Sequence, residues 1–281
     1  MHGQLSPPRI AVTCAVAQAL AAFGGADAQV QAEPAAPRAR ILDVFFGLDD
    51  ALPARANLLC RGVRVAGMDG VPVTFSRRIA LDNPDPSAFR ITTQSGATYT
   101  PRCATLRPAQ GMSKRHTVLL IGELGSERDP PVRMDVVRSV PLLNGGDAMG
   151  LSTDRVTALA LGPELRIGYR YAPGELPKAR CPNSTLQIVQ ITWAGGVTAP
   201  GGDELGEAAR GGMRVTLSNG VEVSPIALAD LGDNDNYTHL CLDTQTPADR
   251  VTVDPGVAID PRGDLNPRTS IRITADPEAL R

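Results

Sequence analysis

Short runs of alternating hydrophobic and polar residues cover most of the chain, and long helical patterns are rare. The clearest run is residues 89–101 (FRITTQSGATYTP), in which two alternating segments flank a Ser-Gly turn. A similar run, residues 213–225 (MRVTLSNGVEVSP), turns at Asn-Gly. Glycine accepts the positive φ of a tight turn without steric cost, so both runs predict β-hairpins.

The two hairpins belong to a longer internal repeat. Met213 follows Phe89 by 124 residues, and Pro225 follows Pro101 by the same number. Each copy holds about seven short β-rich runs bounded by Gly, Pro, Asn and Asp. This pattern is typical of a sandwich of two antiparallel sheets. A small barrel is the alternative. We therefore expect an all-β protein of two tandem antiparallel β-sandwich domains that arose by internal duplication.

Composition predicts where the segments of the chain begin and end. Residues 1–28 hold one Arg before an apolar run and finish in an Ala-x-Ala pattern, which predicts a secretory signal peptide, with a buried Ala-rich helix as the alternative. The polar, Pro-rich residues 29–38 predict a flexible leader. Residues 141–157 carry the Gly, Asn and Asp of a linker, so the two domains are expected at 39–140 and 158–281.

Charge and hydropathy limit the compartments and partners that we expect for this chain. After the signal peptide no stretch approaches the roughly 18 apolar residues of a transmembrane helix, so we expect no membrane span after cleavage. The net charge of −2 gives no reason to expect a nucleic-acid partner. Aromatic residues form 4% of the chain, which argues against a surface that stacks sugars or bases. The Ala-, Gly-, Pro- and Arg-rich composition favours a bacterial periplasmic or secreted protein.

Four cysteines follow the signal peptide, an even number that suits disulfides in an oxidising compartment. Four cysteines permit three pairings. If each copy of the repeat closes its own bridge, the pairs are Cys60–Cys103 and Cys181–Cys241. The other pairings need cysteines of different copies to lie within about 7 Å at their Cα atoms. Metal binding by these cysteines is not favoured, because the chain has no C-x-x-C pair.

Three runs of the first copy carry a family resemblance. Residues 73–79 (VTFSRRI), 86–92 (PSAFRIT) and 117–120 (TVLL) resemble the bacterial Ig-like domains of surface-layer and adhesin proteins. Those domains typically read Val-Thr-Phe-Ser-Glu, then Phe-x-Val, then a strand of alternating Thr and Leu. The resemblance covers residues 60–140 and, less closely, 181–275. It implies a sandwich fold and a non-catalytic role in the envelope or outside the cell, and it assigns no functional residues.

Loops that differ between the two copies are candidates for function. The loop at residues 110–115 (QGMSKR) is basic, whereas its counterpart at 233–236 (DNDN) is acidic, and the acidic turn at 260–267 (DPRGDLNP) exists only in the second copy. Carboxylate and amide oxygens in such turns are the ligands that Ca²⁺ prefers. Asp and Asn also stabilise turns by bonding their own backbone, which is the alternative. The candidate calcium ligands are Asp233, Asp235, Asp260, Asp264 and Asn266.

Residues suited to catalysis are few. His116 and His239 are the histidines that follow the signal peptide, and the repeat places them at nearly the same strand position, which favours a structural role. The chain lacks the G-x-S-x-G elbow of hydrolases and the H-E-x-x-H helix of metalloproteases. We therefore expect a periplasmic or secreted, non-catalytic binding or structural module with an envelope or extracellular protein partner. The alternative is a calcium-dependent hydrolase or adhesin that uses the acidic loops of the second copy.

Overall fold

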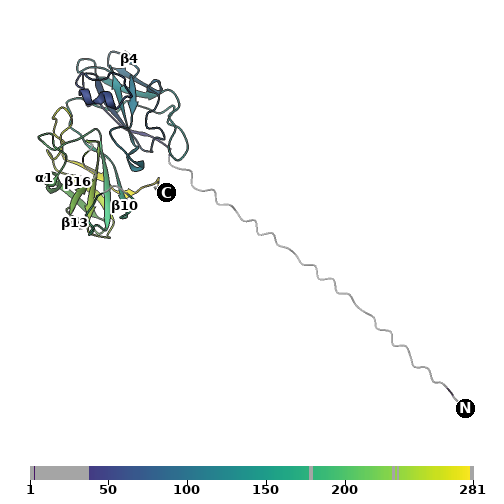
Figure 1. Cartoon of the computed structure of the whole chain (residues 1–281), viewed down its shortest axis with the longest axis vertical. Coiled ribbons are helices and arrows are strands. Elements are labelled where there is room, and N and C mark those ends of the chain that lie inside the picture. The colour runs from purple at the N-terminus through teal and green to yellow at the C-terminus, as the bar shows by residue number, and fades with distance from the viewer. Residues whose placement is uncertain (1–2, 4–37, 177–179, 230–231, 233, 279–281) are drawn as a thin grey trace. The chain divides into compact units, whose positions relative to one another are not determined.

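The structure, a computed structural model, describes residues 3, 38–176, 180–229, 232 and 234–278. Apart from Gly3 and Arg38, the expected signal peptide (1–28) and leader (29–38) lie outside these residues. From Arg38 onward the chain forms one compact unit, built largely of strands (Figure 1). The all-β prediction is therefore confirmed.

The N-terminal half of this unit contains two sheets, in the orders β5-β6-β2-β1-β9 and β4-β3-β7-β8. Neighbouring strands run antiparallel except β1 and β9, which run parallel. The strands are β1 (Ile41–Phe45), β2 (Asp69–Phe75), β3 (Phe89–Thr93), β4 (Thr98–Tyr99), β5 (Cys103–Thr105), β6 (Thr117–Gly122), β7 (Pro131–Val136), β8 (Ser152–Thr153) and β9 (Val156–Thr157).

The C-terminal half has the orders β14-β15-β11-β10-β18 and β13-β12-β16-β17. Raising each strand number of the N-terminal half by nine gives these orders, including the parallel pair, which is β10 with β18. The strands are β10 (Leu165–Tyr171), β11 (Gln187–Trp193), β12 (Met213–Leu217), β13 (Glu222–Val223), β14 (Ala227–Ala229), β15 (Tyr237–Leu242), β16 (Ala248–Val253), β17 (Thr269–Arg272) and β18 (Thr274–Ala275).

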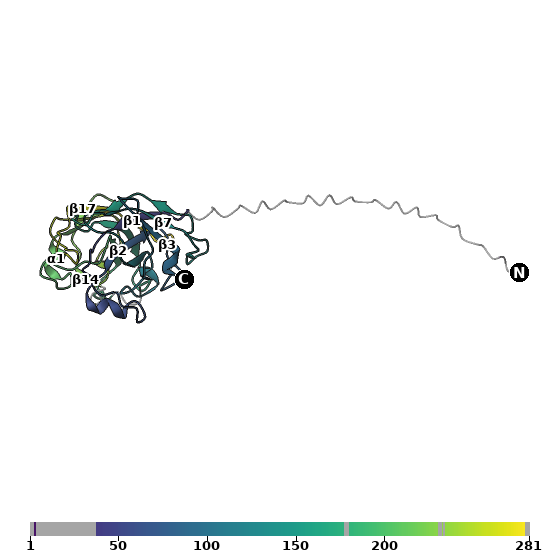
Figure 2. The same ribbon diagram turned by 90° about the horizontal axis from the view of Figure 1, so that it is seen from above.

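Helices in the described residues are short. They are the 3-10 helices η1 (Ala54–Leu58), η2 (Pro86–Ala88) and η3 (Met112–Lys114) and the α-helix α1 (Glu207–Gly211). None of the helices that the structure describes has the length and apolar character needed to span a bilayer. In the view from above, α1 and β14 lie on one side and β3 and β7 on the other (Figure 2).

Both predicted hairpins are confirmed. In the first, β3 pairs with β4 in a register that sets Ile91 opposite Tyr99, and in the second β12 pairs with β13 and sets Val215 opposite Val223. The turns place Gly96 at φ 87° and Gly220 at φ 83°, a backbone conformation that residues with a Cβ rarely adopt. The local pattern of alternation around glycine therefore specified these elements correctly.

The segment expected to be a linker, residues 141–157, contributes strands to the N-terminal half. Thr153 of β8 pairs with Met134 of β7, and Val156 of β9 pairs with Val44 of β1. We therefore use N-terminal half for residues 38–157 and C-terminal half for residues 158–278. The connection between β9 and β10 spans residues 158–164.

Each half has its own apolar core, supplied by both of its sheets. In the N-terminal half, Val118 of β6 and Ile91 of β3 belong to one cluster of buried side chains. In the C-terminal half, the fully buried Trp193 of β11 and Val251 of β16 belong to another. Burying one such side chain stabilises a fold by about 1.5–3 kcal/mol, so these two clusters are the main source of stability in each half.

Both predicted disulfides are present. Cys60 is joined to Cys103 across a Cα separation of 5.9 Å, and Cys181 is joined to Cys241 across 5.8 Å. The two bridges are not equivalent in the repeat, because Cys103 lies on the edge strand β5 whereas Cys241 lies on β15, the neighbour of the corresponding edge strand β14. Each half therefore closes its own bridge, at a different position.

The expectation that His116 and His239 occupy nearly the same strand position is wrong by three residues. His116 directly precedes β6 and its carbonyl accepts a bond from the Phe75 amide, just as Asn236 directly precedes β15 and accepts from the Trp193 amide. Asn236 is thus the counterpart of His116, and His239 lies further along β15. The loops before β6 and β15 differ in sequence, so the comparison of the two copies could not fix the register there.

Candidate functional site: the polar interface between the halves

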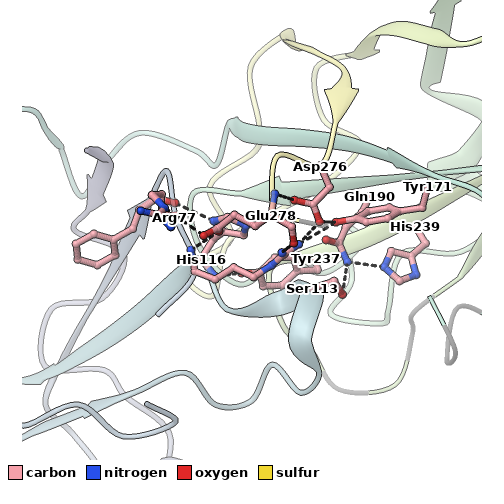
Figure 3. Close-up of polar contacts among 11 residues, drawn as sticks. Arg77, Ser113, His116, Tyr171, Gln190, Tyr237, His239, Asp276 and Glu278 are labelled. Carbon is pink, nitrogen blue, oxygen red and sulfur yellow. Dashed lines mark hydrogen bonds and ion pairs between the residues drawn. The ribbon is translucent and has the colours of Figure 1, made fainter. Parts of the chain in front are cut away.

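Many buried polar side chains lie where the two halves meet (Figure 3). A buried polar group costs free energy unless it finds a hydrogen-bond partner, so each of these side chains constrains how the halves fit together. We call the set the polar interface. It consists of Arg77, Arg78, Ser113, Lys114, His116 and Thr117 in the N-terminal half and of Tyr171, Gln190, Asp235, Asn236, Tyr237, His239, Asp276 and Glu278 in the C-terminal half.

The centre of the polar interface is a pair of reciprocal hydrogen bonds. The His116 amide donates to the Tyr237 hydroxyl at 3.0 Å, and the Asn236 side-chain amide donates to the Thr117 hydroxyl at 2.9 Å. His116 corresponds to Asn236, and Thr117 corresponds to Tyr237, because β6 and β15 begin at Thr117 and Tyr237. Each half therefore uses the same place in its fold to contact the other, which is the pattern of an isologous dimer interface.

A charged cluster around Arg78 flanks this centre. The Arg78 side chain is fully buried and donates to the Asp276 carboxylate, to the Glu278 carbonyl and, at 3.2 Å, to the Tyr171 hydroxyl. The Glu278 carboxylate accepts from the Arg78 amide at 2.7 Å and from Arg77 Nε at 3.2 Å. Burial by itself lowers the pKa of Arg78, but the bond and charge of Asp276 outweigh it and raise the pKa. The charge of Arg78 is therefore firmly held.

A second group of polar contacts begins on η3. Lys114 forms an ion pair with Asp235, with 2.7 Å between Nζ and Oδ2. Beside it, the Gln190 amide nitrogen lies 3.1 Å from the Ser113 hydroxyl and 2.7 Å from His239 Nε2 (Figure 3). These contacts join the basic loop of the N-terminal half to β11, β15 and the acidic loop of the C-terminal half.

Burial keeps two imidazoles and one phenol of the polar interface in their uncharged forms. Burial, reinforced by the charge of Arg78, lowers the pKa of His116 to about 4. Burial, reinforced by the charge of Lys114, lowers the pKa of His239 to about 3. Burial also raises the pKa of the Tyr237 hydroxyl. Both imidazoles and this phenol are therefore neutral at pH 7.

The polar interface contains histidine and serine side chains of the kind that catalyse proton transfer, but these side chains are buried. The exposed fraction is 1% for His116, 3% for His239 and 8% for Ser113. A general base must come within hydrogen-bond reach of a substrate proton. These side chains instead bond other protein groups: His116 Nδ1 bonds the Phe75 carbonyl, and the Gln190 amide bonds His239 in its own half and Ser113 across the interface. The polar interface therefore serves to attach one half to the other.

The predicted calcium ligands fall in two places, with Asp233 outside the described residues. Asp235 lies in the polar interface, where it pairs with Lys114. Asp260, Asp264 and Asn266 come together in one turn: Asp260 Oδ1 accepts from the amides of Arg262 and Asp264 at 2.9 Å each, and Asn266 Oδ1 accepts from the Ala258 amide at 2.7 Å. These bonds are the turn-stabilising chemistry named as the alternative, and calcium binding by this set stays a prediction.

A different acidic cluster, in the N-terminal half, was not predicted. Asp49, Asp50 and Asp69 each place a carboxylate oxygen within 4.8 Å of the others. Asp69 accepts from the Leu124 amide at 2.6 Å and from the Asp50 amide at 2.9 Å. Burial, together with the nearby charges of Asp49 and Asp50, raises the pKa of Asp69 to about 6. Carboxylates this close repel one another, and a divalent cation would relieve the repulsion.

A cavity of about 320 Å³ lies beside the connection between the halves. Its lining includes Leu161 and Leu265, which are exposed, and the side chain of Arg166. Arg166 is already paired, with Asp43 at 3.1 Å and with Glu164 at 2.7 Å. The cationic wall of the cavity is therefore neutralised from within the chain.

One signal in the sequence points to the polar interface. The loop 110–115 of the first copy is basic and its counterpart 233–236 is acidic. In an isologous arrangement, equivalent loops of opposite charge come together, as Lys114 and Asp235 do here. Arg78 gave no comparable signal, because its partners Asp276 and Glu278 lie about 200 residues away in sequence.

Comparison with known proteins adds no assignment to this geometry: no family model matches the chain, and a search of curated proteins finds no match.

Proposed function

We propose that this protein is a non-catalytic binding or structural module of the bacterial envelope, periplasmic or secreted, made of two Ig-like β-sandwich domains that arose by duplication. The observation that carries the proposal is the closed polar interface: the histidines able to do acid–base chemistry are buried where the two halves meet, and their rings contact other protein groups. Function then belongs to the outer faces and loops of a rigid body, as in other scaffold-like proteins.

Several observations support the finer parts of the proposal. The sheet orders of the two halves are the same and their central contacts are reciprocal, as a duplicated and fused dimer requires. Two sheets that share one core in each half suit a sandwich. Two disulfides suit an oxidising compartment outside the cytoplasm, in keeping with the signal-peptide pattern of residues 1–28.

Export of the full chain from a bacterial host tests this placement. We expect a C-terminally tagged chain to be recovered from periplasm or medium, beginning near Gln29 by mass spectrometry and containing no free thiol. A matched variant with Ala26→Leu and Ala28→Leu should remain uncleaved, because the cleavage pattern needs small residues. Recovery of the unmodified chain in the cytosol, with Met1 and free thiols, would overturn the proposal.

A calcium-dependent adhesin or hydrolase is the second candidate function, and the cluster of Asp49, Asp50 and Asp69 favours it. Calcium at 100 times its dissociation constant would stabilise the native state by about 2.7 kcal/mol. We expect the melting temperature to rise on replacing EDTA with millimolar Ca²⁺. Loss of that rise in Asp49→Asn assigns it to this cluster, and loss in Asp264→Asn assigns it to the turn predicted from the sequence. No rise in the parent chain rejects calcium at both places.

A further inference from the structure

The sheet β13-β12-β16-β17 presents a face of arginines and hydroxyl groups to solvent. In β12 the buried side chains of Met213 and Val215 point into the core, so the alternate residues point outward. The same alternation holds in β16, where Val251 and Val253 are buried. We call the outward set the arginine face; it consists of Arg214, Thr216, Glu222, Arg250, Thr252, Ser270 and Arg272.

The register brings these side chains next to one another. Arg250 lies directly opposite Thr216 on one side and Arg272 on the other, and Thr252 lies between Arg214 and Ser270 in the same way. Residues opposite one another in a sheet share a face, and neighbouring strands are about 4.8 Å apart. Three guanidinium groups thus stand on three adjacent strands.

The equivalent face of the N-terminal half is neutralised by its own carboxylates. There Arg90 pairs with Asp135 at 3.4 Å, and Arg133 pairs with Asp135 and with Asp154 at 2.8 Å each. Arg90 lies opposite Asp135, which lies opposite Ser152, so these three correspond by register to Arg214, Thr252 and Ser270. Two arginines meet two carboxylates on this face.

The arginine face has no carboxylate at the positions of Asp135 and Asp154; its one carboxylate, Glu222, lies on β13 opposite Thr216. Thr252 stands where the N-terminal half has Asp135, and Arg272 stands where it has Asp154. Among the described residues no carboxylate forms an ion pair with Arg214 or Arg250; the Arg214 guanidinium instead bonds the carbonyls of Gly211 and Met213. Arg272, with 73% of its side chain exposed, comes no closer than 3.6 Å to Asp249. The face therefore carries an excess of positive charge.

This excess is costly for the fold alone. Like charges directly opposite one another on a sheet, such as Arg250 and Arg272, destabilise it. A bound anion would relieve the repulsion and use the guanidinium groups as forked donors to its oxygens. The two faces are otherwise equivalent, but only the arginine face carries repulsion between like charges that lowers the stability of the fold. This difference points to anion binding on the arginine face.

We propose that the arginine face binds an anionic polysaccharide, one that carries carboxylate or sulfate groups. Apart from Glu222 at the edge strand β13, the face consists of guanidinium and hydroxyl groups, which suit a hydrated, hydroxyl-rich polyanion. It holds no aromatic ring on which a nucleobase could stack and no large apolar anchor of the kind that dominates protein interfaces. This inference rests on the proposed role as a binding module and names its ligand class.

Binding to polygalacturonate, dextran sulfate and neutral dextran tests the inference, with the full chain purified from the bacterial periplasm. We expect affinity for at least one of the two polyanions and none for dextran, weakening as salt screens the charges. Arg250→Gln with Arg272→Gln should weaken polyanion binding by about tenfold or more, since two charge-assisted contacts are lost. The matched control, Arg90→Gln with Arg133→Gln, removes the same charge from the neutralised face and should change affinity by no more than about twofold.

Three results would overturn the inference. The first is a parent chain that binds neither polyanion, and the second is equal loss of binding in the two double variants at unchanged melting temperature. The third is tighter binding to polyglutamate or to phosphatidylglycerol vesicles than to either polysaccharide, which would reassign the face to an acidic protein or a membrane. A chain that is exported but binds no polyanion rejects this inference alone and leaves the proposed envelope location standing.

Discussion

At the scale of single residues, His116 shows how a buried polar group can hold two halves together. Its Nδ1 lies 3.0 Å from the Phe75 carbonyl and so carries the proton, while its backbone amide donates to the Tyr237 hydroxyl across the interface. The ring lies against Tyr169, with 5.6 Å between centroids, and Nε2 makes no hydrogen bond within the described part of the chain. A proton on Nε2 would therefore be buried without a partner, beside Arg78.

This environment predicts a specific acid sensitivity. The pKa of His116 is about 4 in the native state and about 6.5 in the unfolded chain. Between those values the unfolded state binds more protons than the native state, so stability falls as pH decreases from about 6.5 to about 4, by on the order of 3 kcal/mol from this residue. Below that window the contribution is fully lost. Above it, the contribution is fully present.

The variant His116→Gln tests this sensitivity. We expect it to be less stable than the parent at pH 7, because ring packing is lost, but to lose less stability between pH 6.5 and 4. Asp69, whose raised pKa of about 6 acts in the opposite direction, is present in both proteins and cancels in the comparison. Urea unfolding monitored by circular dichroism at half-unit pH steps gives the two slopes. Parallel slopes would show that His116 does not titrate with unfolding.

At the scale of elements, sequence and structure agree where the information is local. The hairpins around Gly96 and Gly220 were predictable, because alternation and turn chemistry act within a dozen residues. The strands β8 and β9 were not, since each has two residues and exists only through pairing with a distant strand. Gly, Asn and Asp in a segment predict a linker from local composition, which carries no information on whether the segment pairs with a distant strand.

The candidate site was less predictable than the fold, for a physical reason. Its contacts join residues that are far apart in sequence, such as Lys114 and Asp235, 121 positions apart. The opposite charges of the two equivalent loops indicate that they attract each other. Identifying the pair itself requires knowing how the two halves contact each other. The arginine face needed the register as well, because it depends on which residue of β16 lies opposite Arg272. The net charge of −2 is a sum over the whole chain, so it does not reveal a locally positive surface.

The two disulfides make a matched prediction at this scale. Their sequence separations are 43 and 60 residues, so the chain-entropy model gives about 4 kcal/mol of stabilisation for each. We expect Cys60→Ala with Cys103→Ala and Cys181→Ala with Cys241→Ala to lose similar free energies of unfolding in urea. Cys181 of the second pair packs against an apolar cluster that Leu42 of the N-terminal half also contacts, so loss of this bridge should in addition weaken the contact between the halves. A loss below about 1 kcal/mol in either variant would contradict the entropic origin.

At the scale of the whole molecule, the two halves behave as a dimer within one chain. Each has its own core and bridge, and each presents the beginning of the same strand, β6 or β15, to the other. The connection at residues 158–164 is short, and the polar interface buries full charges. A buried ion pair is costly to break, because removing one partner leaves the other without compensation. The halves are therefore expected to unfold together.

Calorimetry of Arg78→Leu tests that coupling. The substitution leaves Asp276 and Glu278 in the interface without their buried cation, which should cost about 3–5 kcal/mol. The cost falls on the joint and not on either core, so we expect the single endotherm of the parent to become two, one for each half. The matched control, Arg90→Leu, removes an arginine whose side chain is 50% exposed and should cost about 1 kcal/mol or less with one endotherm retained. One endotherm at the parental temperature in Arg78→Leu would mean that other contacts, such as the reciprocal bonds of His116 and Asn236, hold the halves together without the charged cluster.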